Sequence, residues 1–436
     1  MPQKPTTEDG PALGVLRALF AACAADPALP LVAIRPRAVD AQTAHDGGDY
    51  DLLLPEEAAP GFVRLLAGLC RAAHVSFTID HTHPAKRRIL LHAPEAAADI
   101  VLEVWSHLEV RDPAGAAARV IPWSVIVPRL VGGHLPAHLA ARYYLSHLAT
   151  KGKDQAHPEV RRRLEHYRQA AAELAPAIDR LLAGGDVDAA ATAANRELMA
   201  EGILAPASAA DRREAHRLRR ERHRRRAVSM RRILAFTGPD GVGKSTVIDA
   251  LRGDLRGRSS TVRFKNLFRH HPFYRVLWWR RYATARAANG GALEKNQFDE
   301  QQASALYPLA RSAWPWLRLR GLLFGVQCCD RFYHDLLFAP LRGGGVPGLR
   351  PGWEADARRM PLPGWHLHLD APEDVIRARK QELDPAAISA CRDGLLAIQL
   401  MVDAPFYTCL STGRPIDELR TVLRRAGGQL GLRFRP

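Results

Sequence analysis

The residues best suited to chemistry form one run, GPDGVGKS at positions 238–245. The run fits the pattern G-x-x-x-x-G-K-[ST], whose glycines let the backbone fold so that successive N–H groups point at a phosphate. Lys244 is expected to reach the β and γ phosphates, and the Ser245 hydroxyl is expected to complete the shell of a magnesium ion. The run therefore predicts a binding site for a nucleoside triphosphate, namely ATP with Mg²⁺.

The flanks of this run support the same prediction. ILAF at 233–236 is a short apolar run typical of a buried strand, and TVIDALRGDL from Thr246 continues with helical spacing. A helix that starts at the loop adds its partial positive charge to the phosphate site. The residues predicted to bind the nucleotide here are Gly238, Asp240, Gly241, Gly243, Lys244, Ser245 and Thr246.

A second group of candidate residues is acidic. Asp49 and Asp51 stand two apart in HDGGDYDLLLP, so on a strand both carboxylates face the same side. Glu103, in the β-type run ADIVLEVW, offers a third acid. Clustered carboxylates of this kind can hold paired Mg²⁺ ions for nucleotidyl transfer.

Three runs of the C-terminal part resemble thymidylate kinase and its relatives. GPDGVGKST places Asp240 just before the middle glycine, GVQCCDRFYHDLL contains Asp330-Arg331-Phe332, and HLHLDAPEDVIRARKQEL resembles the strand and arginine-bearing lid of that family. The resemblance covers about 231–436 and is greatest for a bacterial branch often linked to polysaccharide biosynthesis. It implies a P-loop kinase of α/β fold with a parallel sheet.

The resemblance also implies roles for particular residues. Asp330 would hold magnesium or orient an acceptor hydroxyl, Arg331 would hold an anionic group of the acceptor, and Arg377 and Arg379 would close over the phosphates. CLSTGRPIDEL is similar to the strand and loop that contact adenine in the family. The residues of that run expected to bind the nucleotide are Thr412 and Arg414.

The N-terminal part resembles the catalytic core of the nucleotidyltransferase superfamily, through the D-x-D of Asp49 and Asp51 followed by Glu103 on a neighbouring strand. The resemblance implies an α+β fold for this part. Residues 136–228 show helical spacing throughout and contain no strand-like run. We therefore expect three domains: a nucleotidyltransferase-like domain at 1–125, a helical connector at 126–228 and a P-loop kinase domain at 229–436.

The net charge of +16 is concentrated in one stretch. Between Asp211 and Arg232, eleven arginines stand against three acidic residues, which supplies +8. The stretch is either a solvated helical linker with Glu/Arg pairs or a contact for nucleic acid, an anionic glycan or a membrane surface. Outside this stretch the chain is therefore only moderately basic.

Composition excludes several classes of protein. Hydrophobic residues make up 47% of the chain and charged residues 25%, which is typical of a globular protein. The six cysteines lack C-x-x-C spacing, which argues against a disulfide framework or a structural zinc site. The N-terminus lacks the layout of a secretion signal, and charged residues interrupt the longest apolar run, 322–338. We therefore expect the protein to be cytoplasmic.

Three functions remain open on these observations. The first is an ATP-dependent phosphotransferase that moves the γ-phosphoryl group to a small-molecule or glycan acceptor. A particular case of the first is thymidylate kinase proper. The second is a nucleotidyltransferase with a regulatory kinase-like half. The third is a partner of nucleic acid or membrane that uses ATP as a switch. The first predicts an acceptor site within 258–316, where Trp278, Trp279, Trp314 and Trp316 accompany many arginines.

Overall fold

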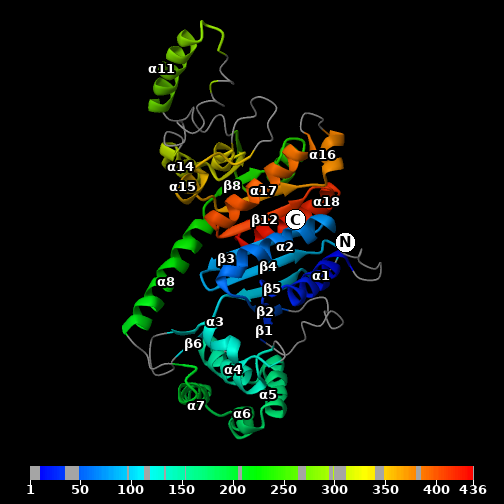
Figure 1. The fold of residues 1–436 in the computed structure, drawn as a ribbon, viewed down its shortest axis with the longest axis vertical. Coiled ribbons are helices and arrows are strands. Elements are labelled where there is room, and N and C mark those ends of the chain that lie inside the picture. The colour runs from blue at the N-terminus through cyan, green and yellow to red at the C-terminus, as the bar shows by residue number, and fades with distance from the viewer. Residues whose placement is uncertain are drawn as a thin grey trace.

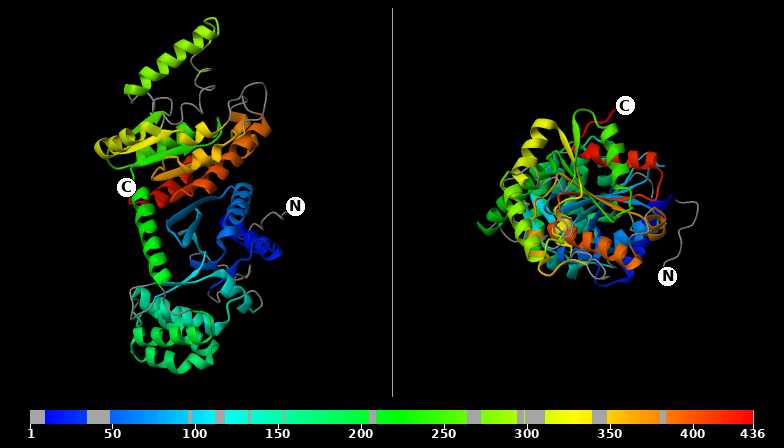
Figure 2. Two further views of the ribbon diagram at one scale, coloured as in Figure 1. Left: turned by 60° about the vertical axis from the view of Figure 1, so that its left-hand side comes forward. Right: turned by 90° about the horizontal axis from the view of Figure 1, so that it is seen from above.

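The computed structural model describes residues 10–34, 49–95, 98–111, 118–131, 134–152, 154–204, 209–263, 272–293, 298, 311–338, 348–379 and 384–435. In Figures 1 and 2 a group of helices, α4–α7, lies at one end of the molecule and α11 at the other, with a large sheet between them. The α/β class expected for the chain is confirmed.

Within the described residues the main sheet has ten strands in the order β1-β2-β5-β4-β3-β12-β11-β8-β10-β9. Their bounds are β1 Val32–Ala33, β2 Asp49–Leu53, β3 Ser76–His83, β4 Lys86–His92, β5 Ile100–Trp105, β8 Ile233–Thr237, β9 Ser259–Arg263, β10 Val326–Asp330, β11 Trp365–Asp370 and β12 Phe406–Ser411. The hairpin of β6 (Leu108–Arg111) and β7 (Ala118–Ile121) lies apart from it.

The C-terminal strands β9, β10, β8, β11 and β12 are all parallel. Every residue of β8, β11 and β12 is buried, as expected of parallel strands that are covered on both faces. β8 stands between β10 and β11. Because the chain leaves β8 toward β9 and leaves β11 toward β12, the carboxyl ends of β8 and β11 meet at a topological switch point, where α/β sheets bind ligands.

The N-terminal and C-terminal strands join in one sheet through β3 and β12. They pair antiparallel, with Phe406 opposite Asp80 and Cys409 opposite Phe77. The junction is also packed, because Tyr407 and Cys409 belong to the same buried cluster as Phe77. The predicted division into domains 1–125, 126–228 and 229–436 stays a proposal, since strands of the first and last segments form a single sheet.

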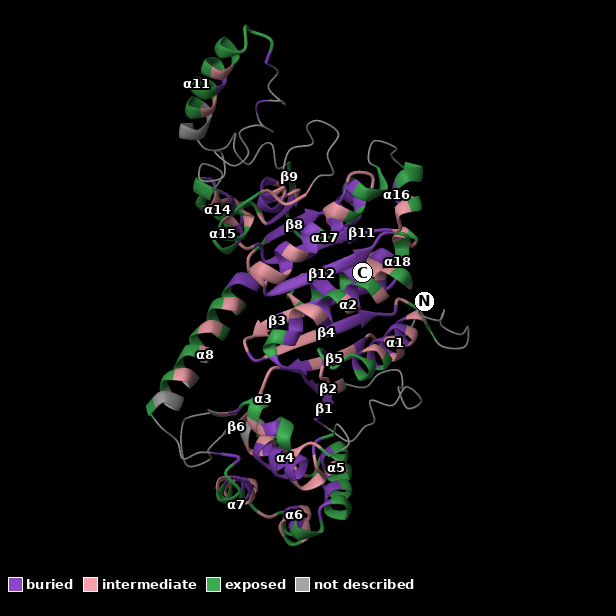
Figure 3. Cartoon of the chain, viewed as in Figure 1, coloured by how far each residue is buried: buried purple, intermediate pink, exposed green. Residues whose placement is uncertain are grey.

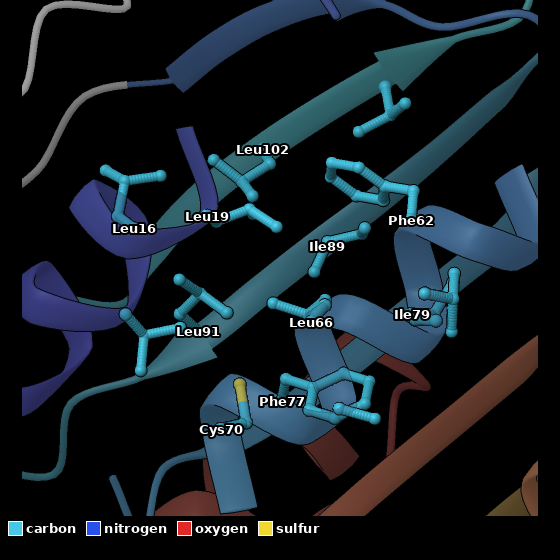
Figure 4. Close-up of a cluster of buried hydrophobic side chains, with 14 of the residues drawn as sticks. Leu16, Leu19, Phe62, Leu66, Cys70, Phe77, Ile79, Ile89, Leu91 and Leu102 are labelled. Atoms are coloured by element: carbon cyan, nitrogen blue, oxygen red, sulfur yellow. The ribbon is translucent and has the colours of Figure 1, made fainter. Parts of the chain in front are cut away.

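The helices cover the sheet in layers. Their bounds are α1 Pro11–Ala25, α2 Ala59–Ala72, α3 Trp123–Ile126, α4 Ala137–Lys151, α5 Pro158–Ala170, α6 Ala175–Leu182, α7 Val187–Ala200, α8 Ala209–Ser229, α9 Lys244–Asp254, α11 Pro272–Ala288, α14 Trp314–Phe324, α15 Trp353–Arg358, α16 Glu373–Arg379, α17 Pro385–Val402 and α18 Ile416–Gln429. Figure 4 shows the N-terminal core, in which Leu16 and Leu19 of α1 and Phe62 and Leu66 of α2 pack on the strands.

In the C-terminal part the two faces of β8 carry different layers. Leu234 and Phe236 face α9 and α18, whereas Ile233 and Ala235 face α14, α15 and α17. This alternation is the period of two expected for a strand that is buried on both sides. The layers hold the carboxyl end of β8 rigidly beside its neighbours.

Helix α8 runs along the side of the molecule (Figure 1), and contacts of Arg225 fix it there. The Nη1 of Arg225 donates to Asp403 Oδ2 at 2.9 Å and to the carbonyl oxygen of His81 at 3.2 Å. Its Nε donates to Glu221 Oε1 at 2.9 Å. Because His81 lies in β3 and Asp403 directly follows α17, one arginine joins the helix to both halves of the molecule.

One described helix, α17, is long and apolar enough to cross a membrane by length and composition. Its residues Ile388 and Ile398 are fully buried between the layers of the molecule. Burial of this kind is typical of a core helix. A core helix can be as long and as apolar as a helix that spans a membrane.

Candidate functional site

The glycine-rich loop, residues 238–245, joins the carboxyl end of β8 to the first turn of α9. Gly238, Gly241 and Gly243 have φ values of 145°, 82° and 96°. These values lie in the region that L side chains rarely adopt, so glycine is required at all three positions. The loop thereby folds back over the start of α9, whose first backbone N–H groups have no partner within the helix and can bind an anion.

Gly238 also has no room for a side chain. A Cβ atom at this position would lie 2.6 Å from the carbonyl oxygen of Leu369. We expect Gly238→Ala to lower the free energy of unfolding by about 2 kcal/mol, because strain at positive φ adds to this overlap. Denaturant unfolding measures the change. Gly253→Ala is the matched control: Gly253 lies in α9 with nothing within 4 Å of its Cβ position, so alanine there should leave stability equal or higher.

Lys244 lies under the loop and is buried, with 8% of its surface exposed. Its Nζ donates to the carbonyl oxygens of Gly238 and Pro239, both at 2.9 Å, and to Asp240 Oδ1 at 3.3 Å. Ser245 and Thr246 follow in the first turn of α9 and are exposed. The ammonium group is therefore held at the concave side of the loop, with two hydroxyl groups beside it.

Asp330 and Arg331 lie next to this loop because β10 pairs with β8, with Asp330 opposite Phe236. Asp330 is half-buried at the carboxyl end of its strand. Arg331 follows at a φ of 66°, and its backbone N–H donates to the carbonyl oxygen of Phe236 at 2.9 Å. This bond turns the chain sharply so that the Arg331 side chain points to the loop.

Arg331 bridges two carboxylates. Its Nη2 donates to Asp240 Oδ1 at 2.5 Å and its Nη1 to Asp335 Oδ1 at 2.8 Å. The charge of Asp335 raises the pKa of Arg331 above its ordinary value, against the opposing effect of burial, so the guanidinium stays charged. Asp240, the acidic residue of the loop, is thus shared between Arg331 and Lys244.

Asp335 was not among the residues predicted from the sequence. Its Oδ2 accepts from the backbone N–H of Phe332 at 3.1 Å, which caps the short helical turn Tyr333–Leu337. Its other oxygen holds Arg331. The available signal was the acid four residues after Arg331 in DRFYHD, a spacing at which side chains on one helical turn meet.

Of the two lid arginines, Arg379 reaches the loop. Its Nη1 donates to the carbonyl oxygen of Val242 at 3.4 Å and its Nη2 to that of Thr412 at 3.1 Å. Arg377, also on α16, is exposed. Lys380, Gln381 and Glu382, which follow Arg379 in the sequence, lie outside the described residues. The arrangement places α16 beside the glycine-rich loop, with one arginine in contact with it.

Thr412 and Arg414 have different surroundings. Thr412 Oγ1 donates to the carbonyl oxygen of Val242 at 2.7 Å, so the segment after β12 lies against the glycine-rich loop. Arg414 points to the N-terminal half, where its Nε donates to the carbonyl oxygen of His74 at 2.7 Å. Its Nη1 donates to Glu418 Oε2 at 2.8 Å. A contact of either residue with adenine stays a prediction.

The three acidic candidates, Asp49, Asp51 and Glu103, lie in the other half of the sheet. Asp51 is opposite Glu103 in the register of β2 and β5, while the side chain of Asp49 lies outside the described ones. Glu103 accepts from Lys86 Nζ at 2.8 Å. Among the described side chains no three His, Cys, Asp or Glu gather as metal ligands. The ammonium group of Lys86 therefore contacts Glu103, one of the carboxylates that were expected to bind a metal ion.

The predicted acceptor segment is described only in part, since 264–271, 294–297 and 299–310 lie outside the described residues. Trp278 of α11 stacks on Tyr282 at a centroid distance of 5.1 Å. Trp314 lies edge-on to Phe332, which follows Arg331, at 6.1 Å. Trp314 thus stands behind the turn that carries Asp330 and Arg331.

Comparison with known proteins adds little to this geometry. No protein-family model matches the chain, and no curated protein matches it. Among solved structures, a sugar kinase from Janibacter sp. is similar with a TM-score of 0.24 and 15% identity, over 45% of this chain and 94% of that one. A TM-score of this size does not establish a common fold.

Proposed function

We propose that the protein is an ATP-dependent phosphotransferase that binds ATP with Mg²⁺ at the glycine-rich loop and transfers the γ-phosphoryl group to a small-molecule or glycan acceptor. The observation that carries the proposal is the loop itself. Three glycines at positive φ, the buried Lys244 and the start of α9 converge at the carboxyl end of the central parallel strand. This arrangement supports the proposal, because a glycine-rich loop at a helix start, with a lysine beside it, suits the binding of phosphates.

Phosphoryl transfer needs alignment and positive charge more than covalent chemistry from the protein. Lys244 and the N–H groups of the loop would hold the β and γ phosphates. Arg331, kept charged by Asp335, contacts Asp240 of the loop and would hold the acceptor, and Arg379 contacts the carbonyl oxygen of Val242 in the same loop. Arg377 of α16 would add charge when the lid closes.

The residues beside the loop fit a magnesium ion. Ser245 offers an exposed hydroxyl in the first turn of α9, and the half-buried Asp330, whose carboxylate makes no hydrogen bond or ion pair with a described side chain, ends the neighbouring strand β10. A hydroxyl and a carboxylate are oxygen ligands of the kind that Mg²⁺ prefers beside phosphates. When bound, the ion would neutralise charge that develops on the phosphate oxygens.

The thymidylate-kinase-like subclass and its acceptor rest on the sequence resemblance. The experiment that tests the proposal incubates the full-length protein with labelled ATP and fractionated bacterial metabolites and glycans. Thymidylate belongs in the same panel, and we expect it to be a poor acceptor. Turnover of thymidylate at about ten per second, a rate usual in metabolism, would instead make the protein a thymidylate kinase proper.

Asp330→Asn should lower kcat about a hundredfold and leave the affinity for ATP nearly unchanged. The carboxylate is proposed to act on the metal or on the acceptor hydroxyl, and both interactions are strongest in the transition state. Steady-state kinetics and equilibrium binding of a fluorescent ATP analogue separate the two effects. Asp249→Asn, on an α9 residue whose side chain is 75% exposed, is the control. If the affinity for ATP and kcat fall by the same factor, Asp330 does not act in the transfer step.

A further inference from the structure

Helix α14 is apolar on both of its sides. Leu317 and Gly321 are buried against the sheet, as expected of a covering helix. The helix also carries exposed residues (Figure 3), and five of them are large and apolar. They are Trp316, Leu319, Leu322, Leu323 and Phe324, with 42%, 41%, 75%, 59% and 47% of their surfaces exposed. A contiguous apolar surface of this kind marks a site of interaction.

The charged residues of α14 itself are all positive. The α14 sequence WPWLRLRGLLF contains no acid, and the guanidinium of Arg320 lies 5.7 Å from the centroid of the Phe324 ring. Arg231, just beyond α8, lies over the Trp314 ring at 5.3 Å. Burial, and then the charges of Arg318 and Arg224, lower the pKa of Arg231. The arginines of α14 and of the end of α8 therefore contribute to one positive field.

Helix α8 extends this field along the side of the molecule. Figures 1 and 2 show it leading up to the end where α14 lies. Most of its arginines are exposed, and its two described glutamates, Glu214 and Glu221, pair with Arg217 and Arg224. The exposed arginines are Arg213, Arg217, Arg219, Arg220, Arg222, Arg224 and Arg226.

We propose that α14, together with the arginines at the end of α8, docks the protein on the surface of an anionic lipid bilayer. Exposed Trp, Leu and Phe side chains suit the boundary between headgroups and acyl chains, and neighbouring arginines suit lipid phosphates. The helix has 11 residues, far too few to span the hydrocarbon core. It lies in the plane of the membrane, with Leu322 and Leu323 directed into it.

Two other occupants fit this surface less well. A second copy on a twofold axis would bring the same residues face to face, so Arg318 and its neighbours would meet their own copies without an acid on α14. Nucleic acid would suit the arginines and Trp316. It would leave the aliphatic side chains of Leu319, Leu322 and Leu323 without a partner, because bases stack on aromatic rings.

The test is flotation of the full-length protein with vesicles of phosphatidylcholine alone and of equimolar phosphatidylcholine and phosphatidylglycerol. We expect binding only to the anionic vesicles, weakened by added salt. The double change Leu322→Glu, Leu323→Glu should lower binding by a factor of about ten or more, because two leucines no longer enter the bilayer. Arg318→Gln should weaken binding by a factor of about five.

Matched controls are Val131→Glu, at an apolar residue between α3 and α4 that is 70% exposed, and Arg162→Gln on α5. Both should bind as the unaltered protein does, and thermal unfolding should be alike for all variants. Three outcomes would overturn the proposal: no flotation with anionic vesicles, flotation that survives the double change, or a dimer in solution that the double change dissociates.

Discussion

Lys244→Met is expected to lower phosphoryl transfer by about a thousandfold, because it removes the charge held at the concave side of the loop. The ammonium group contacts the carbonyl oxygens of Gly238 and Pro239, which form the inner wall of the loop. Methionine keeps most of the buried stem, so the packing of the first turn of α9 is retained. The measurement is the rate of transfer from labelled ATP, together with the thermal unfolding temperature.

Lys86→Met is the matched control for this prediction. Lys86 is also shielded, with 16% of its side chain exposed, but its Nζ pairs with Glu103 in the other half of the sheet. We expect this variant to transfer phosphate as fast as the unaltered protein. If Lys244→Met retains its turnover while Lys86→Met loses it, turnover takes place near Asp51 and Glu103 and not at the glycine-rich loop. The phosphotransferase proposal then fails.

The separation of the two candidate sites follows from the order of the strands. From β5, which carries Glu103, the sheet passes through β4, β3, β12 and β11 to reach β8 and the loop. Five spacings between neighbouring strands, each of about 4.8 Å, put Glu103 on β5 roughly 24 Å from the glycine-rich loop after β8. A nucleotide whose phosphates lie at the loop therefore does not reach Glu103, and a reaction at each site would need its own substrate.

The glycine-rich loop was predictable from the sequence because all of its determinants are local. The apolar run at 233–236 lies in β8, the loop glycines have the positive φ values that their residue type permits, and the helix begins at Lys244. The position of Asp330 beside the loop has an equally local signal, since this residue ends the buried run of β10 and the carboxyl ends of parallel strands share one edge.

Contacts between distant segments were not predictable. The pairing of β3 with β12 joins Thr78 to Thr408, and nothing local in either segment specifies its partner. The strand β3 itself was missed, because SFTIDHTH has few aliphatic residues to mark it. Its polar side chains are buried in a network instead: Thr78 Oγ1 lies 2.7 Å from His92 Nε2 and 2.8 Å from Thr408 Oγ1.

Asp370→Ala is expected to lower the free energy of unfolding by about 4 kcal/mol. Asp370 is 4% exposed at the carboxyl end of β11, and it faces two arginines. Its Oδ2 accepts from the Nε of Arg71, on α2, at 2.6 Å, and its Oδ1 lies 2.7 Å from the Nε of Arg392, on α17. Alanine would leave the guanidinium of Arg392, which is 7% exposed along its side chain, buried without its counter-charge. Denaturant unfolding measures the loss.

The control for Asp370→Ala is Asp179→Ala, which breaks a surface pair with Arg168 in which both side chains are more than half exposed. Such pairs contribute about 0 to 1 kcal/mol, so this variant should unfold almost as the unaltered protein does. Because Arg71 belongs to the N-terminal half and Asp370 to the C-terminal half, hydrogen exchange of β4 and β8 should accelerate together in Asp370→Ala. Faster exchange confined to β8 would show that the two halves unfold separately, and that the shared sheet does not couple them.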